Sequence, residues 1–318
     1  MSGSLAPYVL TFGETMALMR ADQVGPLAHA STMSLGIGGS ESNVAIGLQR
    51  LGVQSVWCGR VGADSLGQLV ERELRAEGVD VRIAVDPASP TGLMIKERRT
   101  PATQRVSYYR AGSAGSRLSP GDVDELLISQ AALLHVSGIT PALSRQAEST
   151  ISYAIAAAKA AGVPVSFDLN FRANLWSREG AAGVYRRIIP LADIVFAGDD
   201  EAAIAVGAGQ PGDLARRIAD LGPSQAVIKL GADGAVALID GQVFCQEAVS
   251  VEAVDTVGAG DAFVAGYLAE YVSGRGPGER LRTAAATGAF ACLVPGDWEG
   301  FPRRHELTLL DTKEPVSR

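Results

Sequence analysis

The chain contains the segment Asp255-Thr256-Val257-Gly258-Ala259-Gly260-Asp261-Ala262-Phe263, in which a glycine-rich turn runs directly into an apolar helical stretch. The first turn of a helix carries backbone N–H groups with no partner inside the helix, and the helix macrodipole adds positive charge there. Glycine lets the backbone approach a bound anion closely. The segment therefore predicts a phosphate site, an anion hole made by the N–H groups of Gly258, Ala259 and Gly260.

Asp261 places a carboxylate where a phosphate held in this turn would react. A carboxylate beside an anion site is unfavourable unless it accepts a proton, for example from an attacking hydroxyl. The alternative is that Asp261 only caps the helix and that the glycines only shape a turn. An isolated GxGD pattern would favour that alternative. The full nine-residue segment favours a catalytic aspartate, and we predict that Asp261 is a general base.

Strand-like and helix-like segments alternate along most of the rest of the chain. The expected strands lie at 8–12, 55–61, 132–136, 163–167, 193–197 and 225–230. The expected helices lie at 41–51, 64–76, 145–161, 178–188, from 199 onward, at 213–221 and at 262–271. This order predicts an α/β fold with a mostly parallel sheet covered by helices on both faces.

Two segments, at about 13–37 and 84–111, break this alternation because they hold β-leaning stretches with no helix between them. We expect them to form a small lid sheet over a site at the carboxyl ends of the main strands. No Ser/Pro-rich linker divides the chain, so we predict a single domain over residues 1–318.

Composition excludes several other classes of protein. The 318 residues are 47% hydrophobic, which suffices for a large core, and the formal net charge is −7. An acidic chain argues against a nucleic-acid partner or a membrane-surface partner. No apolar stretch is long enough to span a bilayer, so we expect a cytoplasmic protein. The three cysteines match no metal-ligand spacing and are expected to be reduced and buried, and His135 is expected in the core.

Other phosphate-binding motifs are missing or misplaced. The chain has no Gly-Lys dipeptide, which excludes a Walker A loop. One GxGxxG match, at 207–212, follows an expected helix rather than a strand and contains a proline, so we interpret it as a chance match.

Several motifs, in the right order, resemble those of the ribokinase-like (PfkB-type) carbohydrate kinases. The segment 255–263 is similar to the family's carboxyl-terminal signature, Gly38-Gly39-Ser40-Glu41-Ser42-Asn43-Val44-Ala45 to its sugar-binding segment, and 59–67 to the motif that follows. The resemblance covers nearly the whole chain. It implies a three-layer α/β/α fold, ATP and Mg²⁺ as cofactors, and phosphoryl transfer to an alcohol group.

Within that family, the segments 108–116, 137–144 and 168–172 resemble those of 2-keto-3-deoxygluconate kinases. The resemblance implies a sugar-acid substrate, contacted by Tyr108, Arg110, Asn170 and Arg172. The two guanidinium groups can grip a carboxylate. The alternatives are a surface salt bridge for Arg172 and lid packing for Tyr108.

The resemblance also assigns roles on both sides of the phosphoryl group. Gly38, Gly39 and Asn43 match the turn that binds sugar hydroxyls. Lys229 and Gly231 match the K-x-G segment near the nucleotide phosphates, although a lysine at a strand end is also compatible with simple exposure.

On the metal side, Glu201 matches a glutamate that organises Mg²⁺ and its waters, and Asp255 lies near the metal or stabilises the turn. Two positions depart from the family pattern. Gly198 stands where asparagine or serine is usual, and Met94 stands where similar kinases often carry a tyrosine facing the substrate.

The function expected from these residues is ATP-dependent phosphorylation of the terminal 6-hydroxyl of 2-keto-3-deoxygluconate or a close analogue. We expect a homo-oligomer that assembles through the lid, because an exposed sheet has free edges. The first rival is a fructokinase-type or ribokinase-type enzyme that acts on a neutral sugar. The second is a non-catalytic sensor of a sugar or nucleotide.

Overall fold

The structure is a computed structural model that describes residues 7–100 and 103–311. Its main sheet has the strand order β13-β12-β11-β10-β9-β8-β1-β4-β5. The strands are β1 Tyr8–Phe12, β4 Gln54–Gly62, β5 Asp80–Asp86, β8 Leu133–Ser137, β9 Val165–Asp168, β10 Ile194–Gly198, β11 Gln225–Lys229, β12 Ala235–Ile239 and β13 Gln242–Gln246. All neighbouring pairs are parallel except those made by β12, so the predicted mostly parallel sheet is confirmed.

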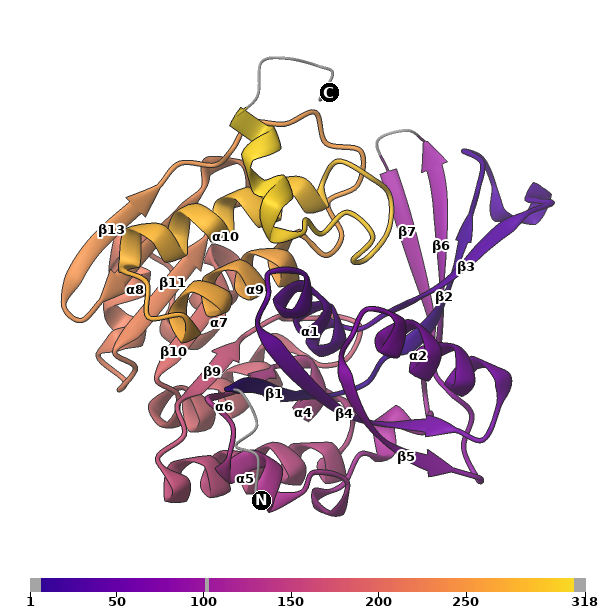
Figure 1. Ribbon diagram of the computed structural model, residues 1–318, viewed down its shortest axis with the longest axis horizontal. Coiled ribbons are helices and arrows are strands. Elements are labelled where there is room, and N and C mark those ends of the chain that lie inside the picture. The colour runs from indigo at the N-terminus through magenta and orange to yellow at the C-terminus, as the bar shows by residue number, and fades with distance from the viewer. Residues whose placement is uncertain (1–6, 101–102, 312–318) are drawn as a thin grey trace.

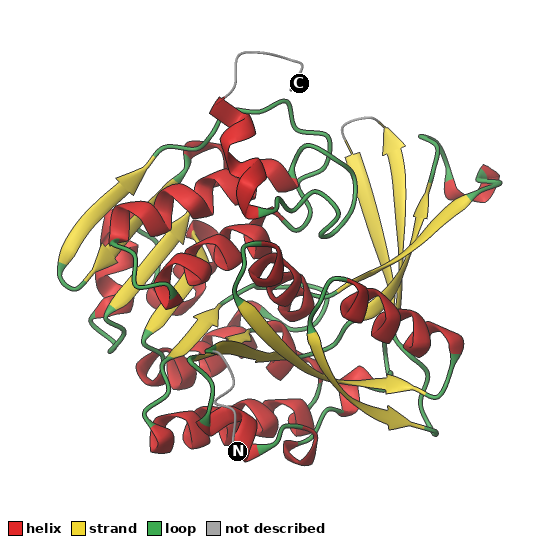
Figure 2. Cartoon of the chain, in the orientation of Figure 1, coloured by secondary structure: helices red, strands yellow, loops and turns green. Residues whose placement is uncertain are grey.

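Helices cover both faces of this sheet (Figures 1 and 2). They are α1 Ser40–Arg50, α2 Ser65–Ala76, α3 Glu125–Ser129, α4 Ile139–Leu143, α5 Arg145–Ala161, α6 Arg178–Ile188, α7 Asp199–Val206, α8 Pro211–Ala219, α9 Ala259–Val272 and α10 Pro277–Ala291. One apolar core joins the sheet to α3, α5, α6, α7 and α8, and a second joins the other face to α1, α9 and α10. The predicted three-layer α/β/α fold is therefore confirmed.

Local signals in the sequence explain where these elements begin and end. The β1 and β8 strands are buried along their whole length, as expected for parallel strands covered on both faces. The side chain of Asp64 caps α2 by accepting a 2.8 Å hydrogen bond from the N–H of Gly67. Helix α5 begins after Ser144, which caps Ala147, and ends at Gly162, whose φ of 71° is left-handed.

A second, four-stranded sheet stands beside the main one and carries the predicted lid strands (Figure 1). It has the order β3-β2-β6-β7, with β2 Met16–Ala21, β3 Met33–Gly38, β6 Leu93–Thr100 and β7 Thr103–Tyr109. Residues 101–102, inside the second predicted lid segment, lie outside the described residues. Strand β5 pairs with β4, so residues 84–86 of that segment lie in the main sheet.

The sequence did not predict strands β12 and β13, which form one lateral edge of the main sheet. The β12–β13 hairpin turns at Asp240 and Gly241, with φ of 49° and 80°, which is the pattern of a tight hairpin turn.

Cys245 on β13 is exposed, so the prediction of a buried thiol is wrong for this residue. Its strand is at the edge of the sheet, where one face meets solvent. His135 is fully buried, as predicted.

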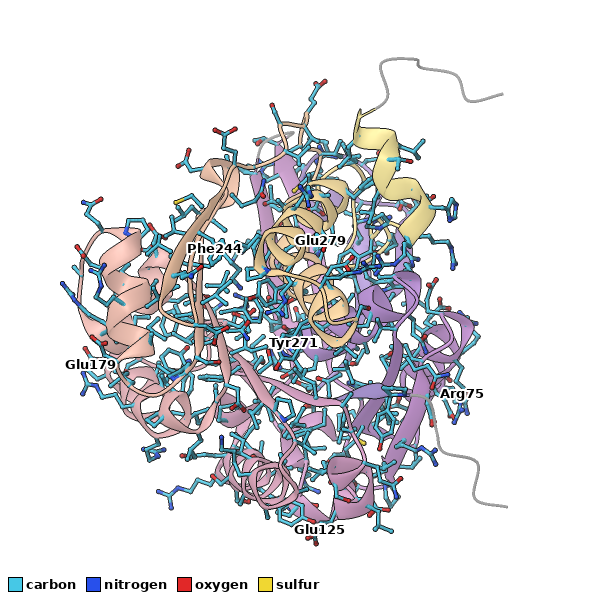
Figure 3. All side chains as sticks on the ribbon, turned by 60° about the vertical axis from the view of Figure 1, so that its left-hand side comes forward. Arg75, Glu125, Glu179, Phe244, Tyr271 and Glu279 are labelled. Atoms are coloured by element: carbon cyan, nitrogen blue, oxygen red, sulfur yellow. The ribbon has the colours of Figure 1, made fainter. Side chains whose placement is uncertain are left out.

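Side chains fill the space between the layers, and charged groups cover the outside (Figure 3). Arg75, Glu125 and Glu179 project outward from their helices, whereas Phe244 and Tyr271 pack against the second core. No helix within the described ranges has the length and apolar character needed to cross a membrane.

Candidate active site

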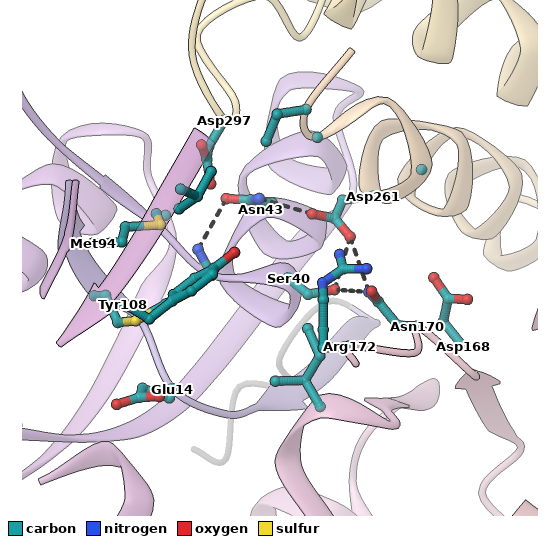
Figure 4. A pocket seen from close by; sticks show the side chains of 18 of the residues that line it. Glu14, Ser40, Asn43, Met94, Tyr108, Asp168, Asn170, Arg172, Asp261 and Asp297 are labelled. Carbon is teal, nitrogen blue, oxygen red and sulfur yellow. Dashed lines mark hydrogen bonds between the residues drawn. The ribbon is translucent and has the colours of Figure 1, made fainter. Parts of the chain in front are cut away.

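A cavity of about 420 Å³ lies at the carboxyl ends of the main strands, between the lid sheet and the amino terminus of α9 (Figure 4). Most of the residues predicted from the sequence line this one pocket: Gly38, Gly39, Asn43, Tyr108, Arg110, Asn170, Arg172, Glu201, Lys229, Gly258, Gly260 and Asp261. Ala259, Gly231 and Asp255 are not among the lining residues. The fold therefore brings together residues from segments more than 200 positions apart.

The glycine-rich turn forms the amino terminus of α9. Gly258 has a left-handed φ of 78°, and a Cβ at this position would overlap the carbonyl oxygen of Asp297. The residue must therefore be glycine for both reasons. The N–H groups of Gly258 and Gly260 donate to no acceptor in the described chain, whereas that of Ala259 donates to the carbonyl of Thr256 at 3.3 Å. Two predicted anion-hole donors are thus available to a ligand.

Asp261 is buried at the edge of this turn and is held by side chains from two other segments. Its Oδ1 accepts a 2.7 Å hydrogen bond from Ser40, and its Oδ2 accepts a 2.8 Å bond from the amide of Asn43. Asn170 lies 3.5 Å from the same Oδ1. Burial raises the pKa of Asp261 above its usual value, although the hydrogen bonds from Asn43 and Ser40 oppose this shift. A fixed carboxylate with a raised pKa suits proton acceptance.

Asn170 adopts a strained backbone conformation directly after β9. Its φ of 41° is left-handed, which is uncommon for a residue other than glycine. Its amide donates a 2.7 Å hydrogen bond to Ser40 Oγ, so the chain Asn170–Ser40–Asp261 is continuous. Such strain persists only where the surroundings fix the residue, and it is common at functional sites.

Gly38 and Gly39 connect the lid to α1 under the pocket floor. A side chain on Gly38 would clash with Asp297 and with the Met94 methyl group, and one on Gly39 would clash with the carbonyl of Glu14. The two glycines therefore permit close packing of the neighbouring chain, and this packing leaves the α1 turn open toward the cavity.

The lid and the loop after β9 each contribute an arginine. Arg110 is braced by the buried Glu14, which accepts a 2.7 Å hydrogen bond from Nε, and its guanidinium lies 5.8 Å from the Tyr108 ring centroid. Arg172 has no carboxylate within 4 Å in the part of the chain that the structure describes. Figure 4 shows its guanidinium pointing toward Asp261.

Lys229, at the end of β11, does not extend into solvent. Its ammonium lies 2.8 Å from both carboxylate oxygens of Asp168, at the end of β9. Burial raises the pKa of Asp168 above its usual value, against the opposing charge of Lys229. Burial lowers the pKa of Lys229, but nearby carboxylates, led by that of Asp168, outweigh this effect and leave it raised. The lysine therefore remains a cation at the pocket wall.

The carboxylates predicted on the metal side are both engaged by backbone groups. Glu201 accepts hydrogen bonds from the N–H groups of Phe171 at 2.8 Å and Gly198 at 2.7 Å. Asp255 accepts from Val257 at 3.0 Å and from Gly296 at 3.2 Å. No group of three or more His, Cys, Asp or Glu side chains within residues 7–100 and 103–311 could hold a metal ion. Each carboxylate oxygen nevertheless keeps a second lone pair for a metal-bound water.

Comparison with known proteins shows which family this chain belongs to. Residues 6–304 match the model of the pfkB family of carbohydrate kinases. The chain belongs to this family. It is 36% identical over 302 residues to a 2-dehydro-3-deoxygluconokinase of Bacillus subtilis, covering 94% of this chain and 93% of that protein. It is 33% identical over 292 residues to a 2-dehydro-3-deoxygalactonokinase of Haloferax volcanii, covering 91% and 92%.

A solved structure supports the fold of this carbohydrate kinase. A putative ribokinase II from E. coli, determined in complex with ATP and Mg²⁺, superposes with a TM-score of 0.90. The two sequences are 26% identical, and the match covers 96% of this chain and 99% of the other.

Several polar residues that line this kinase's pocket were not singled out from the sequence, among them Glu14, Ser40, Lys96, Asp168 and Asp297. Ser40 and Asp168 lie inside motifs already quoted, so their position was a usable signal. Glu14 and Asp297 are single acidic residues in loops and carry no local signal. Lys96 pairs with Asp297, 201 positions away, and only the fold shows that contact.

Proposed function

We propose that this carbohydrate kinase transfers the γ-phosphoryl group of ATP to the terminal 6-hydroxyl of a 2-keto-3-deoxy sugar acid. The hydroxyl oxygen forms the new bond to phosphorus, its proton passes to Asp261, and ADP leaves with the electrons of the broken bond. The observation that carries this proposal is the Asp261 carboxylate, fixed by Ser40 and Asn43 beside the free N–H groups of Gly258 and Gly260. Those N–H groups stabilise charge on the transferring group.

One cationic side chain of the pocket is available to an acidic acceptor. Among the described residues, four cationic side chains line it, and three are paired with carboxylates: Arg110 with Glu14, Lys96 with Asp297, and Lys229 with Asp168. Arg172 has no such partner and is suited to a carboxylate from a ligand. The names of the relatives point to the same class of acceptor, in both its gluconate and galactonate forms. In this proposal Tyr108 and the braced Arg110 complete the clamp from the lid side, and Gly38, Gly39 and Asn170 line the acceptor site.

The nucleotide end of the pocket is assigned to Lys229, Gly231 and the anion-hole turn. Mg²⁺ bound with ATP neutralises phosphate charge. In this proposal Glu201 accepts hydrogen bonds from the waters of that ion through its remaining lone pairs, and Asp255 acts by shaping the turn. The lid limits the access of water, which would otherwise compete with the acceptor hydroxyl.

We also propose that the kinase is a homo-oligomer that assembles through its lid. Strands β3 and β7 are the two edges of the lid sheet, and their outer residues include the exposed Met33, Leu35 and Tyr109. Free backbone groups and apolar side chains on such an edge favour pairing with a second chain.

The experiment that tests the function is ADP release with Mg-ATP and a set of acceptors: 2-keto-3-deoxygluconate, its galactonate epimer, gluconate, fructose and ribose. The proposal predicts strong preference for a keto-deoxy acid. Preference for fructose or ribose would support the neutral-sugar rival, and nucleotide binding without turnover on any acceptor would support the sensor.

A further inference from the structure

Asp168 and Lys229 form a buried ion pair in the wall of the pocket. The side chains are 2% and 17% exposed, and the ammonium contacts both carboxylate oxygens at 2.8 Å. Within the described chain, neither side chain makes a hydrogen bond to any other residue. The whole orientation of the lysine head group therefore depends on one carboxylate.

The pair spans an intervening strand. Asp168 lies on β9 and Lys229 on β11, and β10 runs between them. Lys229 is in register with Gly198, and Asp168 with Phe196. Because side chains alternate along a strand, Asp168, Gly198 and Lys229 point to the same face. Lys229 therefore reaches Asp168 across the end of β10, on the face that Gly198 shares with them.

The ammonium held in this way lies next to the anion hole. A Cβ placed on Gly260 would lie 3.7 Å from Lys229 Nζ, and the N–H group of Gly260 is free for a ligand. The face that carries the pair is also the face covered by α9. Lys229 therefore presents its charge beside the amino terminus of α9, where phosphate is expected.

We propose that Asp168 is the positioning residue of Lys229: its carboxylate holds the ammonium at the phosphate end of the pocket, and it contributes to nucleotide binding through Lys229 alone. This inference rests on the proposed kinase function, since it assigns the phosphates of ATP to Lys229. A free lysine side chain loses rotamer entropy when it binds a ligand, whereas a side chain that is already fixed has lost that entropy before binding. The carboxylate also keeps the buried ammonium charged.

A pair that only stabilises the fold would look similar in the absence of nucleotide, so the test must separate the two roles. We would measure the binding of Mg-ADP and of adenosine by calorimetry, for the wild type, Asp168→Asn, Lys229→Gln and the double variant. These titrations contain no acceptor sugar. If the acceptor assignment fails, the titrations still report on this inference.

We expect Asp168→Asn and Lys229→Gln each to weaken Mg-ADP binding about tenfold, which corresponds to about 1.4 kcal/mol. The double variant should bind Mg-ADP as Lys229→Gln does, because Asp168 acts only through the lysine. Adenosine, which has no phosphate, should bind equally to all four proteins. Asp168→Glu should recover part of the loss. Asp200→Asn, on an exposed residue of α7, is the charge-matched control and should bind as the wild type does.

Three results would overturn the inference. Unchanged Mg-ADP affinity in Asp168→Asn would remove the positioning role, and unchanged affinity in Lys229→Gln would remove the lysine from the phosphates. Losses that multiply in the double variant would show that Asp168 acts independently. If Asp168→Asn does not fold because it leaves a buried ammonium unpaired, the comparison of Lys229→Gln with the double variant still decides the question.

Discussion

The side-chain amide of Asn43 donates a 2.8 Å hydrogen bond to Oδ2 of Asp261, which joins the first turn of α1 to the first turn of α9. Ser40, the first residue of α1, donates to the other oxygen at 2.7 Å. The helix that carries the proposed sugar-binding turn therefore also orients the proposed base. A sugar bound to that turn would meet a carboxylate that is already in place, which is the geometric requirement for efficient proton transfer.

Replacing Asn43 with alanine should therefore impair the base as well as sugar binding. Without the amide, the carboxylate is less stabilised in a buried site, so the pKa of Asp261 should rise further. We expect kcat to fall about tenfold, in line with the loss of one hydrogen bond to a charged group, and the acidic limb of the pH profile of kcat/KM to move to higher pH. Ser42→Ala, which removes a hydroxyl bonded to the carbonyl of Gly39, is the control and should leave that limb in place.

Replacing Arg172 with glutamine should selectively weaken the binding of an acidic acceptor. We expect KM for 2-keto-3-deoxygluconate to rise about 10- to 100-fold, the range for a lost charge-assisted contact, with little change in KM for ATP. Arg178→Gln, on an exposed arginine of α6, is the matched control. A rise in KM for ATP alone would place Arg172 on the transferring phosphate instead.

Met94 should contribute to the selectivity of the pocket for an acceptor with a methylene carbon over one that carries a hydroxyl there. It is 4% exposed and packs with Met16 and Leu18 in an apolar cluster, of which Met16 and Met94 line the cavity. A thioether donates no hydrogen bond, so this wall favours a methylene over a hydroxyl-bearing carbon. We expect Met94→Gln to lower the kcat/KM ratio of 2-keto-3-deoxygluconate to 2-ketogluconate about tenfold. Met94→Leu should preserve this ratio. If the ratio in Met94→Gln equals that of the wild type, the Met94 wall does not contact the deoxy carbon.

The buried Asp261 carboxyl should also make the thermal stability of the protein depend on pH. Burial raises the pKa of Asp261 in the folded state, so the folded protein binds this proton more tightly than the unfolded chain does. Its stabilising contribution is complete below the unfolded pKa and is lost as pH rises through the folded one. In thermal unfolding scans, the Tm of Asp261→Asn minus the Tm of the wild type should therefore increase as pH increases. Asp200→Asn should show no such trend, and a flat difference for Asp261→Asn would argue against a buried, ionising carboxylate.

Periodic and capping signals were sufficient to predict much of the fold. Helix α5 spans the residues 145–161 that its alanine-rich pattern predicted, and β1 lies where its apolar run predicted. The glycine turn before Asp261 also forms a helix start, one turn earlier than the apolar stretch alone indicated. These features depend on neighbouring residues, which a single sequence contains.

The pairing of charged groups could not be predicted in the same way. The partner of Arg110 is Glu14, 96 positions away, and the partner of Lys229 is Asp168, 61 positions away. Which carboxylate meets which cation depends on strand order and on the position of the lid, and neither leaves a local pattern. For the same reason, the sequence suggested two equivalent arginines in the clamp, whereas the structure shows one braced by Glu14 and one without a carboxylate partner among the described residues.

The most direct test of the account is the turnover of Asp261→Asn with Mg-ATP and the acceptor that the wild type prefers. Asparagine keeps the shape of the side chain but cannot accept the proton. The account predicts that kcat falls by about two to four decades, the range for a positioned general base, while the binding of Mg-ADP changes little. A kcat near that of the wild type would contradict the assignment of Asp261 as the base.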